Sequence, residues 1–278
     1  MSSAQRQRQR QRQRRVRYSA KTADKHVLYE ESVQEVDADI KFVSRVYKKK
    51  HGVKPMILRE DFCGTARMCA SWVKSDKNRK AIGVDLDQPT LDWGLKRHFA
   101  QLGDRAKRVK LLCQNVLTAR STPADVTVAL NFSYWIFKER HELKKYFQAA
   151  RKHLKPGGAF VLDIYGGPDA QIVSTEDRKL KGFTYIWEQG PYNAFNAHAK
   201  RYIHFRFPDG TQMRKAFVYD WRIWSLPEVQ DLLYDAGFSQ VDLYWEGCDE
   251  DGDGNGVFRQ VRQVENEECW IAYVVGWR

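Results

Sequence analysis

The chain has 278 residues, of which 42% are hydrophobic and 13% aromatic, and its formal net charge is +12. These values are typical of a globular protein, and no run of about 18 apolar residues is present that would predict a membrane-spanning helix. Seven of the positive charges are arginines within residues 1–17, which leaves +5 on the remainder. We therefore expect a mildly basic, soluble body with a strongly basic tail.

Residues 1–20 are predicted to be a disordered tail, because the Arg/Gln alternation in 1–17 offers no apolar face to bury. Weak contact of its arginines with nucleic acid or an anionic surface is the alternative to simple solvation. The tail lacks the apolar stretch of a signal peptide. The five cysteines are too scattered for a zinc framework or a disulfide scaffold. These features predict a cytoplasmic protein without a metal site, and they leave its oligomeric state open.

Residues 21–55 are expected to form an N-terminal helical segment. Through residues 24–50 apolar side chains recur at helical spacing, namely Val33, Val36, Ile40, Val43 and Val46. A basic run before Gly52 ends the pattern. We expect one amphipathic helix, with Tyr29 near its start either closing over a ligand or packing as an ordinary core aromatic.

Residues 56–170 alternate short apolar runs with helical stretches, the pattern of right-handed strand-helix-strand units and a mainly parallel sheet. Strands are predicted at 56–58, 80–84, 109–113, 126–132 and 159–165. Helices are predicted at 65–73, 88–101 and 139–153. The segment is therefore expected to form the core of an α/β fold with helices on both faces of the sheet.

The pattern changes in residues 171–224, where 183–189, 199–207 and 213–224 alternate in the β manner. We expect an inserted antiparallel cap there. In residues 225–278, Pro227 lies in the first turn of a predicted helix that ends at Gly237. Two last strands, at 241–245 and 270–275, would complete a seven-stranded sheet with an antiparallel edge.

Candidate ligand-binding residues follow the predicted strands. In an open α/β sheet, ligands bind beyond the carboxyl ends of the strands where the winding reverses. After the first strand, Gly64 lets backbone approach a ligand closely, and the amides that open the next helix can meet a carboxylate. Asp85 ends the second strand and can accept both hydroxyls of a ribose. After the third strand, Asn115 can pair with an adenine edge while Val116 presses on the ring.

At the first of these turns the sequence reads Glu60-Asp61-Phe62-Cys63-Gly64-Thr65-Ala66. It resembles the first motif of the class I S-adenosylmethionine (SAM)-dependent methyltransferases, an acid followed by a glycine-rich stretch such as Gly-Cys-Gly-Thr-Gly. Phe62 and Ala66 stand where that family has glycines. The resemblance covers about residues 56–166 and returns at 226–238. It implies a Rossmann-like fold, SAM as the cofactor, and methyl transfer as the reaction.

The resemblance also implies a set of cofactor-binding residues, most of them at the strand ends. They are Tyr29, Glu60, Asp61, Cys63, Gly64, Thr65, Asp85, Leu86, Asn115, Val116 and Asn131. Gly64 and its neighbours would face the methionine part, Asp85 would hold the ribose, and Asn131 would lie beneath the sulfonium. The family's acidic role falls to either Glu60 or Asp61.

Residues that bind the methyl acceptor are expected in the cap and near the ends of central strands. Methyl transfer from a sulfonium is an in-line displacement, so alignment and exclusion of water matter most and a general base is optional. The candidates are Tyr134, Tyr165, Trp187, Tyr192, Asn193, Tyr219, Trp221 and Arg222. Tyr219 and Trp221 would share one strand face. Tyr134 and His204 are weak catalytic candidates, with a histidine bonded to a neighbouring strand as the alternative for His204.

The acidic stretch 249–256 resembles a calcium loop in composition. Its twelfth position is Gln260 instead of a bidentate glutamate, and its flanks have strand patterns. We therefore expect a solvated connection there.

The leading hypothesis is a SAM-dependent methyltransferase that modifies a nitrogen or oxygen atom of a small-molecule acceptor. One alternative is an RNA or protein methyltransferase that uses the basic tail, and another is a noncatalytic SAM- or nucleotide-binding module. An NAD-dependent oxidoreductase is disfavoured because the three-glycine phosphate-binding fingerprint is absent from the first turn.

Overall fold

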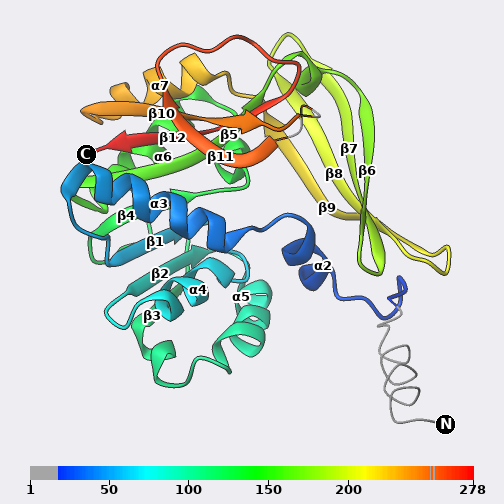
Figure 1. The fold of residues 1–278 in the computed structure, drawn as a ribbon, viewed down its shortest axis with the longest axis horizontal. Coiled ribbons are helices and arrows are strands. Elements are labelled where there is room, and N and C mark those ends of the chain that lie inside the picture. Colours follow the sequence, from blue (N-terminus) through cyan, green and yellow to red (C-terminus); the bar gives the residue numbers. More distant parts are fainter. Residues whose placement is uncertain (1–17, 251, 253) are drawn as a thin grey trace. The chain divides into compact units, whose positions relative to one another are not determined.

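The computed structural model describes residues 18–250, 252 and 254–278 (Figure 1). Most of the predicted tail, residues 1–17, lies outside the described residues. The chain divides into two compact units. The first, here the α/β unit, comprises residues 35–171 and 222–278. The second, here the β unit, comprises residues 172–221 and the described chain up to residue 34.

The α/β unit is built on an eight-stranded sheet with the order β11-β10-β12-β5-β4-β1-β2-β3 (Figure 1). Its five parallel neighbours are β1 (Ile57–Asp61), β2 (Lys80–Asp85), β3 (Val109–Cys113), β4 (Ala124–Ala129) and β5 (Leu154–Gly166). Strand β12 (Trp270–Trp277) runs antiparallel to both β5 and β10 (Gln240–Cys248). The winding reverses between β1 and β4, so their carboxyl ends flank the place where such a sheet binds ligands.

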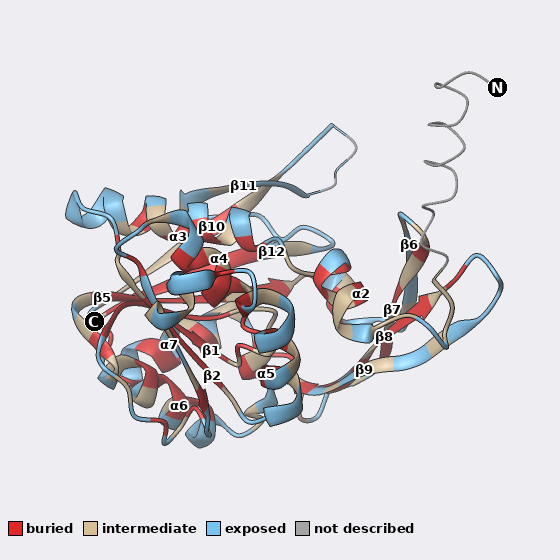
Figure 2. Cartoon of the chain, turned by 90° about the horizontal axis from the view of Figure 1, so that it is seen from below, coloured by how far each residue is buried: buried red, intermediate tan, exposed pale blue. Residues whose placement is uncertain are grey.

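Helices cover both faces of this sheet. They are α3 (Val36–His51), α4 (Arg67–Ser75), α5 (Gln88–Gly94), α6 (Arg140–Lys152) and α7 (Leu226–Asp235). Shorter helical turns are formed by Leu95–Phe99, Gly103–Arg108, Ser133–Ile136 and Pro168–Gln171. Figure 2 shows α3 and α4 on one side of the sheet and α6 on the other. The predicted α/β fold with a mainly parallel, helix-covered sheet is confirmed.

The predicted number of seven strands is wrong, because β11 (Gly254–Val261) adds an eighth strand, antiparallel to β10, at the edge. Most side chains of β11 are exposed, so its sequence lacks the apolar alternation that identifies a half-buried strand. Phe258 and Val261 are the exceptions, and Phe258 packs on Phe42 and Tyr273. The acidic connection before β11 includes Asp251 and Asp253, which lie outside the described residues.

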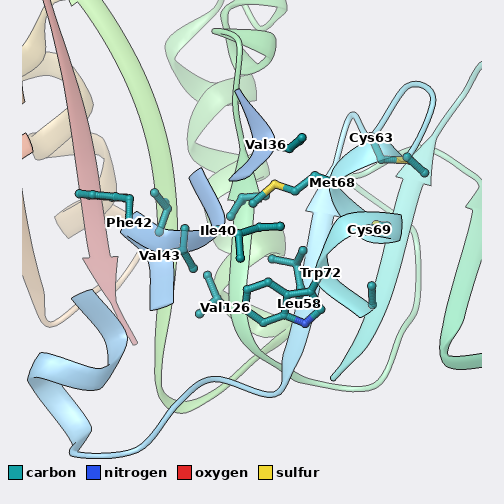
Figure 3. Close-up of a cluster of buried hydrophobic side chains, with 14 of the residues drawn as sticks. Val36, Ile40, Phe42, Val43, Leu58, Cys63, Met68, Cys69, Trp72 and Val126 are labelled. Atoms are coloured by element: carbon teal, nitrogen blue, oxygen red, sulfur yellow. The ribbon is translucent and has the colours of Figure 1, made fainter. Parts of the chain in front are cut away.

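The amphipathic pattern of α3 explains how this helix packs on the sheet. Val36, Ile40 and Val43 are buried at the i, i+4 and i+7 spacing of one helix face. Figure 3 shows these side chains in one cluster with Phe42, Leu58, Met68, Trp72 and Val126. Each such buried side chain stabilises the fold by about 1.5–3 kcal/mol.

The predicted single helix over residues 24–50 is instead two helices. Helix α2 (Lys25–Ser32) is capped at its N-terminus by Asp24, whose carboxylate accepts the N–H of His26 at 2.8 Å. It belongs to the β unit, whereas α3 belongs to the α/β unit. The boundary between the two units therefore runs through the predicted segment 21–55.

The β unit carries an antiparallel sheet with the order β6-β7-β8-β9. Its strands are β6 (Ser174–Leu180), β7 (Phe183–Asn193), β8 (His198–Arg206) and β9 (Gln212–Arg222), the last of which ends at the boundary between the units. Strand β6 was not predicted, because five of its seven side chains are exposed and its residues show no apolar alternation. Ala20, predicted as part of the tail, instead donates its N–H to Thr211 Oγ1 at 3.0 Å.

No helix in the described part of the chain combines the length and hydropathy of a membrane span.

Candidate functional site

The turn after β1 has an unusual backbone. Phe62, Gly64 and Ala66 all have left-handed conformations, with φ of 57°, 52° and 53°. A non-glycine residue in this region costs about 1–2 kcal/mol, so the surrounding structure must impose the conformation on Phe62 and Ala66. The chain thus keeps the path of a glycine-rich turn at three alternate positions, although only Gly64 is a glycine.

The two neighbouring acids at the end of β1 have different partners. The carboxylate of Asp61 accepts hydrogen bonds from Arg59 Nε at 2.7 Å and Tyr146 Oη at 3.1 Å, and Asp61 and Arg59 are fully buried. Glu60 points to the opposite face of the strand. Its carboxylate accepts the backbone N–H of Cys69, in α4, at 3.1 Å. Asp61 is therefore neutralised by a cation, whereas Glu60 has no salt bridge to any described residue.

Asp85 joins the first two turns of the sheet. One of its carboxylate oxygens accepts the N–H of Gly64 at 2.7 Å, and the other accepts the N–H of Asp87 at 2.9 Å. The next side chain, Leu86, is 67% exposed. A carboxylate and an open apolar side chain thus lie at the end of β2, directly beside the left-handed turn.

The loop after β3 is held to β1 by a buried arginine. Arg59 Nη1 donates to the carbonyl of Ala119 at 3.3 Å and to Ser121 Oγ at 3.0 Å. At the start of this loop, Asn115 Oδ1 accepts the N–H of Leu117 at 2.9 Å, which leaves the amide NH₂ of the exposed Asn115 side chain available. Val116 is buried, so its side chain already packs within the protein.

The loop after β4 contains a second left-handed segment. Asn131 and Phe132 both have φ of 56°. Their backbone N–H groups donate to the two carboxylate oxygens of Asp163, in β5, at 2.6 and 2.9 Å. The side-chain amide of Asn131 makes no hydrogen bond to any residue that the structure describes.

Burial and mutual repulsion keep several acids near this edge of the sheet weakly acidic. Burial, opposed by hydrogen bonds from Cys69 and assisted by the charges of Asp39 and Asp85, raises the pKa of Glu60 to about 7. Burial also raises the pKa of Asp163 to about 7, with a contribution from Asp39 and against its backbone hydrogen bonds. The pKa of Asp39, in α3, is raised to about 6. Ionisation of this group of acids favours a cationic ligand.

Three predicted substrate residues of the α/β unit have structural roles. Tyr134 is fully buried and donates its hydroxyl to the carbonyl of Asp163 at 3.0 Å, so it has no surface for a substrate or for catalysis. Tyr165 is 8% exposed and packs 4.8 Å from the ring of Trp135. Arg222 forms a salt bridge with Glu228 at 2.9 Å. A residue near a strand end can thus belong to the core, because helices cover both faces of the sheet.

The other aromatic candidates lie within the β unit. Tyr219 and Trp221 stack with ring centroids 4.4 Å apart, as expected for one strand face, and Trp187 lies 6.4 Å from Trp221. Tyr29 packs 4.7 Å from the ring of Phe217. Half of the predicted aromatic set therefore forms a packed cluster.

Three further candidates of the β unit have partners in neighbouring strands and turns. Asn193 Oδ1 accepts the N–H of Phe195 at 3.0 Å in the turn after β7, and Tyr192 pairs with Ala199. His204 is buried; its Nδ1 accepts the N–H of Lys215 at 3.1 Å, and its Nε2 lies 3.0 Å from the carboxylate of Glu188. This is the interstrand histidine that was the alternative to a catalytic role.

Among the residues that the structure describes, no three His, Cys, Asp or Glu side chains are arranged to hold a metal ion.

Residues 61–162 match the family model described as a methyltransferase domain. This segment is a methyltransferase domain. The predicted family, enzyme class and cofactor are confirmed at this level. The match runs from the last residue of β1 through the left-handed turn and Asp85 to most of β5.

Solved structures with the same fold cover nearly the whole chain, beyond the methyltransferase domain itself. A SAM-dependent methyltransferase from Clostridium acetobutylicum is 20% identical, with a TM-score of 0.64 over 90% of this chain and 96% of that one. An amino pentose methyltransferase from Micromonospora echinaspora is 14% identical, with a TM-score of 0.63 over 91% and 95%. A sugar N-methyltransferase from Streptoalloteichus is 17% identical, with a TM-score of 0.61 over 92% and 93%. No curated protein sequence matches the chain.

The sequence analysis did not single out four buried or partly buried residues whose hydrogen bonds stabilise the strand ends around the site, namely Asp39, Arg59, Tyr146 and Asp163. The available signal was a charged residue inside an apolar strand, as with Asp163 in residues 159–165 and Arg59 in β1. Such a residue is buried and needs partners.

Proposed function

We propose that the protein transfers the methyl group of SAM to an amine nitrogen of a small molecule, with an amino sugar as the preferred acceptor class. The observation that carries the cofactor part is the hydrogen bond of 2.7 Å between Gly64 N–H and Asp85, which places a carboxylate beside the left-handed turn. The acceptor class is supported by the printed functions of two similar structures, an amino pentose methyltransferase and a sugar N-methyltransferase.

The residues around the first two strand ends fit the parts of SAM. The Gly64 turn, with Cys63 and Thr65, offers backbone to the methionine part. Asp85 retains acceptor lone pairs for the ribose hydroxyls, since an ionised carboxylate has about four acceptor sites and two are used. The exposed Leu86 can cover one face of the adenine.

Two further positions complete the proposed cofactor site. The free amide NH₂ of Asn115 can meet the adenine edge, and Asn131 lies at the β4 end of the winding reversal, where we place the sulfonium. Val116 contributes through packing of its loop, because its side chain is already buried.

Of the two adjacent acids, Glu60 is the one we assign to the cationic end of the cofactor. Asp61 is already neutralised by Arg59 and Tyr146. Glu60 has a buried carboxylate without a salt bridge, and a cation brought near it would favour its ionised form. The structure therefore supports Glu60 as the acid of the first motif.

The reaction is a direct displacement. SAM supplies an activated methyl group: the lone pair of the acceptor nitrogen forms a bond to the methyl carbon, the carbon–sulfur bonding pair returns to sulfur, and the nitrogen loses a proton to solvent. The protein's residues bind, orient and exclude water, and the reaction itself requires no general base.

The test is methyl transfer from isotopically labelled SAM to a panel of amino sugars, each paired with its hydroxyl analogue, and to an RNA oligonucleotide. We expect label in the amino sugars only. Label in the hydroxyl analogues would assign oxygen methylation, and label in RNA would favour the alternative that uses the basic tail. Absence of S-adenosylhomocysteine (SAH) formation with every acceptor, in protein that binds SAM, would favour a noncatalytic module.

A further inference from the structure

Asp163, at the carboxyl edge of the sheet, contacts two consecutive residues that have a left-handed conformation. Its two oxygens accept one N–H each, from Asn131 at 2.6 Å and Phe132 at 2.9 Å. Successive backbone N–H groups in such a turn form a concavity that binds an anion. In this protein a carboxylate of the neighbouring strand fills that concavity.

These two hydrogen bonds stabilise the backbone of the loop after β4. L residues with side chains avoid left-handed backbone, and both Asn131 and Phe132 adopt it. The backbone of Asp163 is held in place as well, because its carbonyl accepts a hydrogen bond from the hydroxyl of the fully buried Tyr134 at 3.0 Å. The carboxylate is thus a rigid support for the start of the loop.

The supported loop follows β4 directly, across the winding reversal from β1. Clamping of the backbone leaves the side-chain amide of Asn131 without a partner on the described protein, although the residue is half-buried. An unpaired, half-buried amide at this edge is available to a ligand. The conformation of the loop decides where that amide lies.

We propose that Asp163 is a positioning residue that holds Asn131 and Phe132 in their left-handed conformation and thereby places the Asn131 amide and its backbone against the sulfonium end of the donor. The inference rests on the proposed function, since it requires SAM to bind at this edge. It predicts that Asp163 sets the preference of the protein for SAM over SAH, which lacks the transferable methyl group and its positive charge.

The test is calorimetric titration of the full chain with SAM and with SAH, comparing Asp163→Asn and Asp163→Glu with the wild type. The amide in Asp163→Asn offers a single acceptor oxygen for the two N–H groups. Glutamate keeps the charge but displaces the carboxylate by one methylene. We expect both variants to lose roughly tenfold or more of the preference for SAM, with SAH affinity changed less than about threefold, because such hydrogen bonds to a charged group are strong.

Asp125→Asn is the matched control. Asp125 also accepts two consecutive backbone N–H groups, from Met56 at 2.8 Å and Ile57 at 2.7 Å, but it does so at the amino end of the sheet. The control should lower thermal stability and leave the preference for SAM unchanged.

The outcomes separate the two proposals. If only Asp163→Asn loses the preference for SAM, the negative charge matters but its exact position does not. If both variants keep the preference, Asp163 has only a structural role. Either result overturns the inference. If the wild type binds neither SAM nor SAH, the proposed function itself is contradicted, and the inference about Asp163 falls with it.

A fallback covers a failure of either Asp163 variant to fold. Phe132→Gly is then added to it, since glycine adopts a φ of 56° without support. Asn131 still needs the support of Asp163, so a double variant whose preference for SAM equals that of Phe132→Gly alone would also overturn the inference.

Discussion

The two ends of the same sheet treat buried acids differently. At the amino end, Asp125 accepts two backbone N–H groups and also forms a salt bridge with Lys155 at 2.7 Å. At the carboxyl end, Glu60 and Asp163 accept backbone N–H groups as well, yet neither forms a salt bridge with any described residue. The difference indicates that the charge of Asp125 is balanced within the protein, as is that of Asp61 by Arg59, whereas the charges of Glu60 and Asp163 are left for a ligand.

The largest expected effect concerns the paired acid of the carboxyl end, Asp61. Arg59→Met would leave its fully buried carboxylate without a cation, which typically costs about 3–5 kcal/mol. Lys155→Met is the matched change at the amino end, where the lysine side chain is 41% exposed and the salt bridge contributes about 1 kcal/mol or less. Urea unfolding measures the free energy of unfolding of both variants. Equal losses of stability in Arg59→Met and Lys155→Met would contradict the difference between the buried and the exposed salt bridge.

The second effect is on cofactor binding. Asp85→Asn removes the charge that we assign to the ribose hydroxyls, and a loss of about 1.5–3 kcal/mol corresponds to roughly 10- to 150-fold weaker SAM binding. Asp92→Asn, at an exposed position of α5, is the control and should bind SAM like the wild type. Calorimetry checks both variants, and unchanged affinity in Asp85→Asn would remove this acid from the site.

The third effect is a dependence of SAM affinity on pH. The pKa of both Glu60 and Asp163 is raised to about 7, so a rise from pH 6 to pH 8 ionises both carboxyls and should strengthen SAM binding roughly three- to thirtyfold. SAH should respond less because it lacks the sulfonium. Glu60→Gln should weaken the dependence of SAM affinity on pH. A wild-type affinity that stays constant or falls as the pH rises would contradict the assignment of unpaired acids to the cofactor site.

The same ionisation has the opposite sign for the ligand-free protein. A carboxyl whose folded pKa lies above its unfolded value stabilises the fold at low pH and loses that contribution as the pH rises through 7. Thermal unfolding without ligand should therefore shift to lower temperature between pH 6 and pH 8 and recover on addition of SAM. Glu60→Gln should show a smaller shift.

The smallest effect concerns the left-handed turn. Gly64→Ala should cost about 1 kcal/mol in stability, because φ is 52° while the nearest atom to an added Cβ is 4.0 Å away. Gly103→Ala imposes the same conformational cost, with φ of 56° and no atom within 4 Å. Both variants should lose similar stability, but only Gly64→Ala should weaken SAM binding. Equal SAM affinities would exclude close approach of the turn to the cofactor.

Much of the fold could be predicted because the periodicity of the sequence reflects burial. The strand at 109–113 was predicted with the bounds that β3 has, and the helix at 139–153 differs from α6 by one residue at each end. Strands β6 and β11 were missed because most of their side chains are exposed, and an exposed strand need not alternate.

The candidate site could be predicted where the chemistry of a residue at a strand end suggests a single role. Gly64 and Asp85 fall in this class, and the structure joins them by a hydrogen bond. The left-handed conformations of Phe62 and Ala66 were not predictable, since tertiary contacts impose them against local preference. Tyr134 shows the opposite failure, because a position near a strand end does not reveal that α6 and β5 bury the side chain.

The most direct test of a SAM site at the carboxyl end is a crystal structure with SAH bound. We predict that the Asp85 carboxylate lies within hydrogen-bond distance, about 3 Å, of the ribose hydroxyls, with the amino-acid end of the ligand against the Gly64 turn. A nucleoside bound elsewhere on the chain, or one at this end that Asp85 does not contact, would contradict the account.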